Sequence, residues 1–149
     1  MQVVLVEPEI PQNTGSIARL CAATSTPLHL VGRLGFSLED RYLKRAGLDY
    51  WPFVDLHVHA SWSDFLAAVP TPRRLAFSSH GETSYTRVAY EPDDALVFGG
   101  ETAGLPADLR AELAPLYCIP MPGSGVRSLN VSNAVSIVVY EALRQLSRV

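Results

Sequence analysis

The stretch VVLVEPEIPQNTGSIARLCAATS, residues 3–25, joins a short apolar run to a helical pattern through a polar turn. The run over 3–8 is apolar enough to predict a buried strand, and 11–25 follows with helical spacing. Asn13 is able to cap the start of that helix. The apolar stripe of the helix consists of Ile17, Leu20, Cys21 and Thr24. A strand followed at once by a helix is the repeating unit of parallel α/β sheets.

The same alternation continues along the whole chain. Further strands are predicted at 28–32, 54–60, 74–79, 95–100 and 116–121. Further helices are predicted at 37–47, 61–69, 105–115 and 130–146. Residues 80–94 are predicted to be a loop. The pattern therefore predicts an α/β fold, a parallel sheet with helices on both faces.

Length and composition limit the classes of protein. At 149 residues with 48% hydrophobic content, the chain is expected to form one domain spanning 1–149 with a full core. No apolar run reaches membrane-spanning length, and the N-terminus is too quickly acidic for a signal peptide. Two cysteines, Cys21 and Cys118, make no disulfide framework, so reduced thiols in the cytoplasm are expected. The net charge of −3 disfavours nucleic acid, although DRYLKRAG at 40–47 is locally basic.

Gly-rich, polar segments follow three of the predicted strands, at 7–19, 98–106 and 119–133. Ligands of open α/β sheets bind outside the carboxyl ends of the strands. The third segment places Arg127, Ser128 and Asn130 at the start of the apolar helix predicted at 130–146. Helix capping by Asn130 accounts for one or two of these polar groups, and a ligand site is the alternative interpretation.

Several common chemistries lack their motifs. FGGETAG does not have the spacing of a dinucleotide-binding loop, no Gly-Lys-Ser/Thr follows a strand, and GSG is no nucleophile elbow. His57 and His59 share one strand face, but no set of ligands with metal spacing accompanies them. A solvated face is the favoured interpretation of this pair, and we expect no metal.

The closing helix has two distinct faces. Its predicted core stripe consists of Val131, Val135, Val138, Val139, Ala142 and Leu146. Its opposite face carries Asn133, Ile137, Tyr140 and Arg144. A mixed apolar and polar face with a tyrosine is typical of a subunit contact, and a surface covered by a loop is the alternative.

The three segments together resemble the SPOUT class of RNA methyltransferases. The matching motifs read EPEIPQNTGSIARLC, LVFGGETAGLP and CIPMPGSGVRSLNVSNAVSIVVYEA, and KRAGLDYW adds to the match. The chain is most similar to the short tRNA (cytidine/uridine) 2'-O-methyltransferases that act on the wobble nucleotide, over about residues 3–146. Gly100 and Gln12 depart from that pattern, since proline is common at both positions, but neither change removes a functional group.

The resemblance implies a C-terminal trefoil knot, which topology rules alone would exclude. It also implies S-adenosylmethionine (SAM) as cofactor, with no metal requirement because the sulfonium already activates the methyl group. The residues that it places around SAM are Phe77, Ser78, Gly99, Ile119 and Ser128.

The resemblance further implies catalytic roles for Arg19, Asn13, Glu101 and Asn130. A permanently charged arginine is a poor base, so we expect Arg19 to stabilise an alkoxide or engage a phosphate. The implied partners are tRNA and a second copy of the chain, paired through the closing helix. Substrate contacts are expected at Arg41, Lys44, Arg45 and Tyr140. Methylation of ribosomal RNA and a catalytically silent knotted RNA-binding module remain the alternatives.

Overall fold

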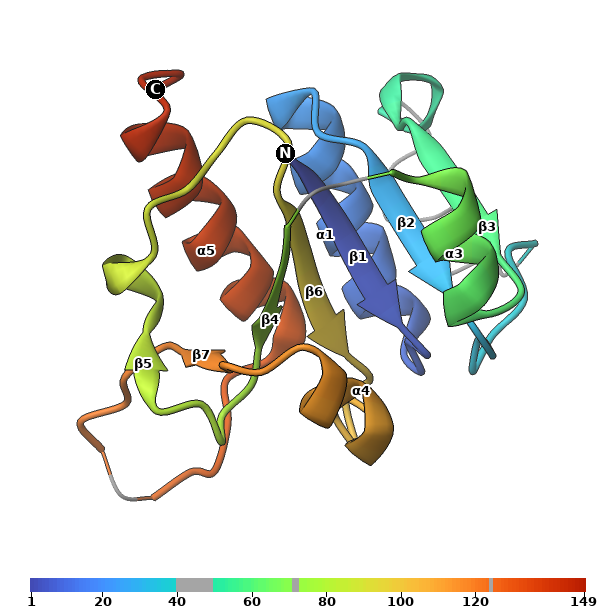
Figure 1. Cartoon of the computed structure of the whole chain (residues 1–149). Coiled ribbons are helices and arrows are strands. Elements are labelled where there is room, and N and C mark those ends of the chain that lie inside the picture. Colours follow the sequence, from blue (N-terminus) through green and yellow to red (C-terminus); the bar gives the residue numbers. More distant parts are fainter. Residues whose placement is uncertain (40–49, 71–72, 124) are drawn as a thin grey trace.

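The computed structural model of the chain describes residues 1–39, 50–70, 73–123 and 125–149. Within these ranges, seven strands form one sheet in the order β3-β2-β1-β6-β4-β7-β5 (Figure 1). The strands are β1 Gln2–Val6, β2 Leu28–Val31, β3 Leu56–His59, β4 Arg74–Phe77, β5 Thr83–Ser84, β6 Ala95–Gly99 and β7 Tyr117–Cys118. The pairings between them are parallel, which confirms the predicted sheet.

The order of the strands reverses at β1, which lies between β2 and β6. Val6 pairs with Val31 on one side and with Gly99 on the other, so these three strands end at the same level. Their carboxyl ends lie side by side at the end of the sheet where α4 lies (Figure 1). Such a switch point is where open α/β sheets bind their ligands.

Helices cover both faces of the sheet, as predicted. One face carries α1 (Pro11–Thr24) and α5 (Val131–Gln145), and the other carries α3 (Trp62–Ala68) and α4 (Ala107–Glu112) (Figure 1). The side chains of β1 alternate between two hydrophobic clusters because successive residues of a strand point to opposite faces. Val3 and Leu5 pack beneath α1 and α5, and Val4 and Val6 pack on the other side. The apolar run at the start of the chain is therefore buried on both faces.

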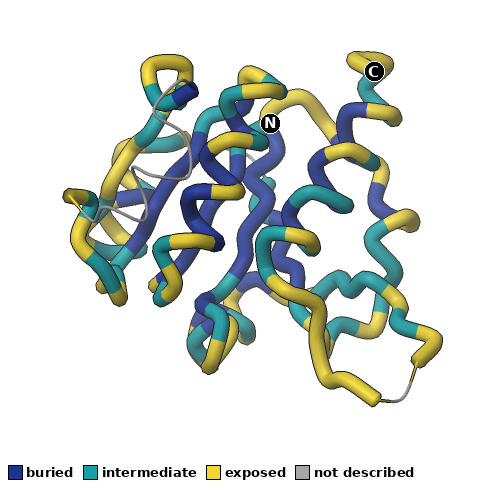
Figure 2. Tube along the Cα trace, turned by 180° about the vertical axis from the view of Figure 1, so that it is seen from behind, coloured by how far each residue is buried: buried dark blue, intermediate teal, exposed yellow. Residues whose placement is uncertain are grey.

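The buried stripe of the closing helix differs from the predicted one at both ends and at one position between them. Val135, Val138, Val139 and Ala142 are buried as predicted, and Leu143 joins them without having been predicted. Val131 and Leu146 are only half-buried. On the opposite face Tyr140 is 50% exposed, and the exposed side of the helix is visible from behind (Figure 2).

Several predicted boundaries were wrong. The strand predicted at 116–121 is reduced to β7, because Pro120 and Pro122 lack the N–H that a sheet requires. The first strand ends at Val6, since Glu7 adopts a left-handed backbone with φ of 50°. The predicted loop 80–94 contains β5 and a 3-10 helix, η2 (Tyr85–Arg87).

Other predicted elements differ less or lie elsewhere. The helix predicted at 105–115 is shortened to α4, and a second 3-10 helix, η1 (Trp51–Phe53), precedes β3. Most of the helix predicted at 37–47 lies outside the described residues. Within the described ranges, none of the helices combines the length and the apolar character needed to cross a membrane. The trefoil knot stays a prediction.

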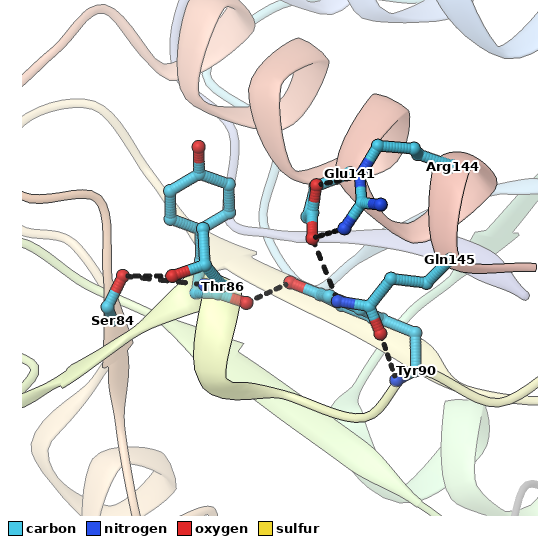
Figure 3. A network of polar contacts seen from close by, with 7 residues as sticks. Ser84, Thr86, Tyr90, Glu141, Arg144 and Gln145 are labelled. Atoms are coloured by element: carbon cyan, nitrogen blue, oxygen red, sulfur yellow. Dashed lines mark hydrogen bonds and ion pairs between the residues drawn. The ribbon is translucent and has the colours of Figure 1, made fainter.

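A polar network ties α5 to the segment that follows η2 (Figure 3). The Tyr90 N–H donates to the side-chain oxygen of Gln145 at 3.2 Å, and Gln145 donates to Glu141 at 2.8 Å. Hydrogen bonds from Arg144, and then from Gln145, lower the pKa of the Glu141 carboxyl to about 2. The network connects the last turns of α5 to the segment after η2. It does not include residues at the carboxyl ends of the strands.

Candidate functional site

The three polar segments converge at the carboxyl ends of β1 and β6. The Asn130 side-chain amide donates to the Asn13 side-chain oxygen at 3.0 Å, and the Asn13 amide donates to Glu101 at 2.9 Å. Asn13 is buried at 9% exposure, although its partners come from positions 88 and 117 residues away. Three of the four predicted catalytic residues thus form one hydrogen-bonded cluster.

Asn13 does not cap α1, contrary to the sequence-based prediction. The helix begins at Pro11, its N-cap is Ile10, and Ile10 makes no side-chain capping bond. Glu101 lies beside this end of the helix and accepts hydrogen bonds from the backbone N–H of Glu9 at 2.8 Å and of Ile10 at 3.3 Å. A carboxylate is favoured there because the start of a helix carries partial positive charge. The prediction failed because the helix begins at Pro11, which places Asn13 inside the first turn rather than before it.

The loop that presents Glu101 is closed by glycines. The Gly104 N–H donates to the Gly100 carbonyl at 3.0 Å, and Gly104 has a φ of +69°, which favours glycine. A Cβ on Gly99 would lie 2.1 Å from the backbone of Gly104. A Cβ on Gly100 would lie 2.5 Å from the Glu7 carbonyl. Both positions therefore admit only glycine, and together they fix where Glu101 projects.

A cavity of about 180 Å³ opens beside this loop. All five residues predicted to surround the cofactor line it, namely Phe77, Ser78, Gly99, Ile119 and Ser128. Its walls combine apolar residues, such as Phe98 and Leu105, with three serines. Apolar walls with a few oriented polar groups are the usual composition of a cofactor site.

The cavity also includes residues that the sequence did not single out. Arg110 from α4 and His80 from the segment after β4 line it. Arg110 lies in an ordinary helical pattern and His80 in a predicted loop, so neither carries a sequence signal of its own. Only the return of α4 across the ends of the strands brings Arg110 to the cavity.

Arg19 lies apart from the cluster and does not line the cavity. It is exposed on α1, and its guanidinium carbon lies 5.1 Å from the centre of the Tyr50 ring. A cation within about 6 Å of an aromatic centroid is attracted to the face of the ring. Among the described residues, the hydrogen bonds that join Asn13, Glu101 and Asn130 do not include Arg19.

The predicted substrate contacts are only partly within the described residues. Tyr140 is exposed on α5, remote from the hydrogen-bonded cluster at the start of that helix. Arg41, Lys44 and Arg45 lie outside the described residues.

His57 and His59 share one face of β3, as predicted, but that face is not simply solvated. Both rings stack on the buried His29 of β2, with centroids 4.7 and 5.3 Å away. Burial, and then the charges of the two neighbours, lower the pKa of His29 to about 4. Among the described residues, no group of three or more side chains is arranged to hold a metal ion.

The parallel sheet, its covered faces and the glycine-closed cavity at the switch point are those of a SPOUT-class methyltransferase. The chain belongs to the SpoU rRNA Methylase family, whose sequence model matches residues 1–140.

Individual proteins are similar over nearly the full length of the chain. A tRNA (cytidine(34)-2'-O)-methyltransferase of Burkholderia pseudomallei is 49% identical over 96% of this chain and 94% of its own length. A structure solved to give insights into the 2-OH methylation of C/U34 on tRNA is 50% identical, with a TM-score of 0.94 over 99% of this chain and 97% of its own. The SpoU methyltransferase AviRb from Streptomyces viridochromogenes, solved with AdoMet, is 28% identical, with a TM-score of 0.82 over 99% of this chain and 58% of its own.

Proposed function

We propose that this chain is a SAM-dependent tRNA methyltransferase that modifies the ribose 2'-oxygen of nucleotide 34. The observation that carries the proposal is the convergence of Asn13, Glu101 and Asn130 beside the glycine-closed cavity. Relatives at about half identity over nearly full length are tRNA (cytidine(34)-2'-O)-methyltransferases, which indicates the wobble nucleotide as target. The base is cytidine or a modified uridine, such as carboxymethylaminomethyluridine.

The cavity has the chemistry to hold SAM. Phe77 and Ile119 provide an apolar wall for an adenine ring, and the hydroxyls of Ser78 and Ser128 are available as hydrogen-bonding groups. At Gly99 the absence of a side chain keeps the backbone open to a ligand. When bound there, SAM supplies a methyl group that its sulfonium has already activated.

The chain's own residues then orient the ribose and stabilise charge. The cluster of Asn13, Glu101 and Asn130 locks the three loops together, so the walls of the cavity and the ribose site keep a fixed geometry. The Arg19 guanidinium stabilises the 2'-alkoxide that forms as the hydroxyl gives its proton to solvent, or binds the neighbouring phosphate. Because Arg19 does not line the cavity of its own chain, it reaches a ribose bound beside SAM only when the RNA spans both copies of a dimer.

The chain forms a single SPOUT domain over 1–149. Its active form is a homodimer in which two chains pair through α5. The exposed Tyr140 and the half-buried Ile137 supply the mixed face expected of such a contact. An RNA that spans both copies meets two sets of Arg41, Lys44 and Arg45, basic side chains that attract its phosphates although the net charge is −3 per chain. The enzyme works in the cytoplasm, where tRNA is found.

Two alternatives remain testable. Ribosomal RNA as substrate is favoured by the name of the family and by an rRNA methyltransferase of Sinorhizobium meliloti that is 27% identical, whereas the relatives at about half identity that are named for their target act on tRNA. A silent RNA-binding module would not need the closed glycine loop and the intact hydrogen-bonded cluster.

Methyl transfer decides among these functions. The protein is incubated with methyl-labelled SAM and, separately, with total tRNA and ribosomal RNA, and the modified nucleotide is mapped. Label on the 2'-oxygen of nucleotide 34 in tRNA is the expected result. Label confined to ribosomal fragments moves the substrate, and SAM binding without any transfer supports the silent module.

A further inference from the structure

Tyr50 is a buried residue with a polar end that reaches α1. It is 9% exposed within the hydrophobic cluster beneath α1 and α5. Its hydroxyl donates to the Gly15 carbonyl at 2.7 Å. In an α-helix that carbonyl also accepts the N–H four residues later, which belongs to Arg19. Tyr50 therefore holds the turn of α1 from which Arg19 projects.

The ring of the same tyrosine contacts the Arg19 side chain itself. The guanidinium carbon lies 5.1 Å from the ring centre, and Arg19 as a whole residue is exposed to solvent. Within the described part of the chain, Arg19 makes no hydrogen bond or ion pair through its guanidinium. An aromatic face attracts the cation without using its N–H groups, so all five remain available to a ligand.

We propose that Tyr50 is a positioning residue that presents the Arg19 guanidinium to the RNA. The inference rests on the proposed function, because it takes Arg19 as the group that stabilises the 2'-alkoxide or binds the adjacent phosphate. Tyr50 fixes Arg19 at two points, with its hydroxyl on the backbone and its ring on the side chain. A carboxylate partner would hold the guanidinium as firmly but would compete with the anionic substrate.

Two substitutions separate the contacts. Tyr50→Phe keeps the ring and removes the bond to Gly15, so methyl transfer is expected to stay within a few-fold of the unsubstituted protein. Tyr50→Leu removes the ring and frees the guanidinium to move. Since a displacement of about 1 Å at a reacting group costs on the order of 100-fold, we expect kcat to fall by about 10- to 100-fold. The Kd for SAM should change less than about twofold, because Tyr50 does not line the cavity.

Tyr90 offers a matched control for loss of packing. It is buried in the same hydrophobic cluster, and its hydroxyl also donates to a backbone carbonyl, that of Tyr85 at 3.0 Å. Tyr90→Leu is expected to lower the thermal unfolding midpoint as Tyr50→Leu does while leaving kcat nearly unchanged. A fall in kcat as large as that of Tyr50→Leu would overturn the proposal.

A double substitution tests whether Tyr50 acts through Arg19. In an Arg19→Ala background, Tyr50→Leu should lower kcat no further. An additional loss of about tenfold there would show that Tyr50 acts independently and would overturn the positioning role. Full activity of Arg19→Ala alone would remove the role assigned to Arg19 and this inference with it.

A spectroscopic readout keeps the inference testable without RNA. The Arg19 Nε–H proton should resonate upfield in the NMR spectrum because it lies against the Tyr50 ring. Tyr50→Leu should abolish the shift, and Tyr90→Leu should preserve it. Absence of the shift in the unsubstituted protein overturns the inference, whereas absence of methyl transfer together with a normal shift counts against the proposed function alone.

Discussion

The side-chain amide of Asn130 donates to the side-chain oxygen of Asn13 at 3.0 Å, across 117 positions of the chain. The direction of this bond is fixed at both ends. Asn130 uses its own oxygen to accept from the Ser132 N–H at 2.9 Å, so its amide nitrogen must face Asn13. Asn13 uses its amide to donate to Glu101, so its oxygen must face Asn130. The cluster therefore has one hydrogen-bonding arrangement, which makes it sensitive to isosteric changes.

Asn13→Asp should test that sensitivity. The substitution keeps the shape of the side chain but places a second carboxylate against Glu101, where a donor is required. We expect the free energy of unfolding at pH 7 to fall by about 1–3 kcal/mol, as for other disrupted buried hydrogen bonds. Urea unfolding measures the loss, which should shrink at low pH as one carboxyl is protonated. Asn133→Asp, on the exposed first turn of α5, should be neutral or slightly stabilising.

Gly99→Ala should disrupt the cofactor cavity. The added methyl would lie 2.1 Å from the Gly104 backbone, so the loop carrying Glu101 must move. We expect SAM affinity to fall by at least about tenfold, which is about 1.4 kcal/mol of binding free energy, as measured by calorimetry. Gly123→Ala is the matched control, since its methyl would meet nothing within 4 Å. Equal SAM affinity in the two variants would contradict the cavity assignment.

Arg19→Ala should separate catalysis from cofactor binding. Arg19 does not line the cavity, so the Kd for SAM should stay within about twofold. Loss of a group that stabilises an oxyanion lowers kcat by about 100- to 1,000-fold, and we expect a loss of this size in single-turnover methyl transfer. Arg148→Ala, at an exposed position near the C-terminus, should retain normal activity. Loss of SAM binding by Arg19→Ala would show that its role is misassigned.

His29 should make the stability of the fold depend on pH. Its pKa is lowered to about 4 in the folded chain from an ordinary 6.5, so the unfolded chain binds more protons between these values. Stability should therefore fall as pH falls through this window, by up to about 3 kcal/mol at pH 4. The neighbouring His57 and His59 act in the same direction and Asp55 opposes them. Urea unfolding between pH 4 and 7 should show a flatter dependence for His29→Leu, and an unchanged one for exposed His80→Gln.

The layers of the fold could be predicted because they depend on local periodicity. The run at Val3 to Val6 is apolar at every position, which fits a strand buried on both faces, and the helices follow such strands in order. Boundaries were predicted less well where a backbone constraint outweighs the pattern. Glu7 turns left-handed at the end of β1, and Pro120 interrupts the last strand.

The site could be predicted only in part, for a physical reason. Gly-rich segments after strands indicate where a ligand binds, and the residues predicted around the cofactor do line the cavity. Contacts that depend on the return of distant segments leave no local signal. Asn13 has a side chain suited to a helix cap, yet it lies in the first turn and donates to Glu101, 88 positions away. Nothing in the spacing places Tyr50 against Arg19.

The hydrogen bonds of Glu101 to the backbone before α1 have a consequence for how the protein opens. Because the Glu9 and Ile10 amides find their acceptor on the 99–104 loop, the first turn of the helix and that loop must detach together. Their amide protons should exchange with deuterated water as one cooperative unit. Occupation of the cavity beside the loop should then slow amide exchange at the start of α1. The exchange rates of the Glu9 and Ile10 amides would therefore report whether the cofactor is bound.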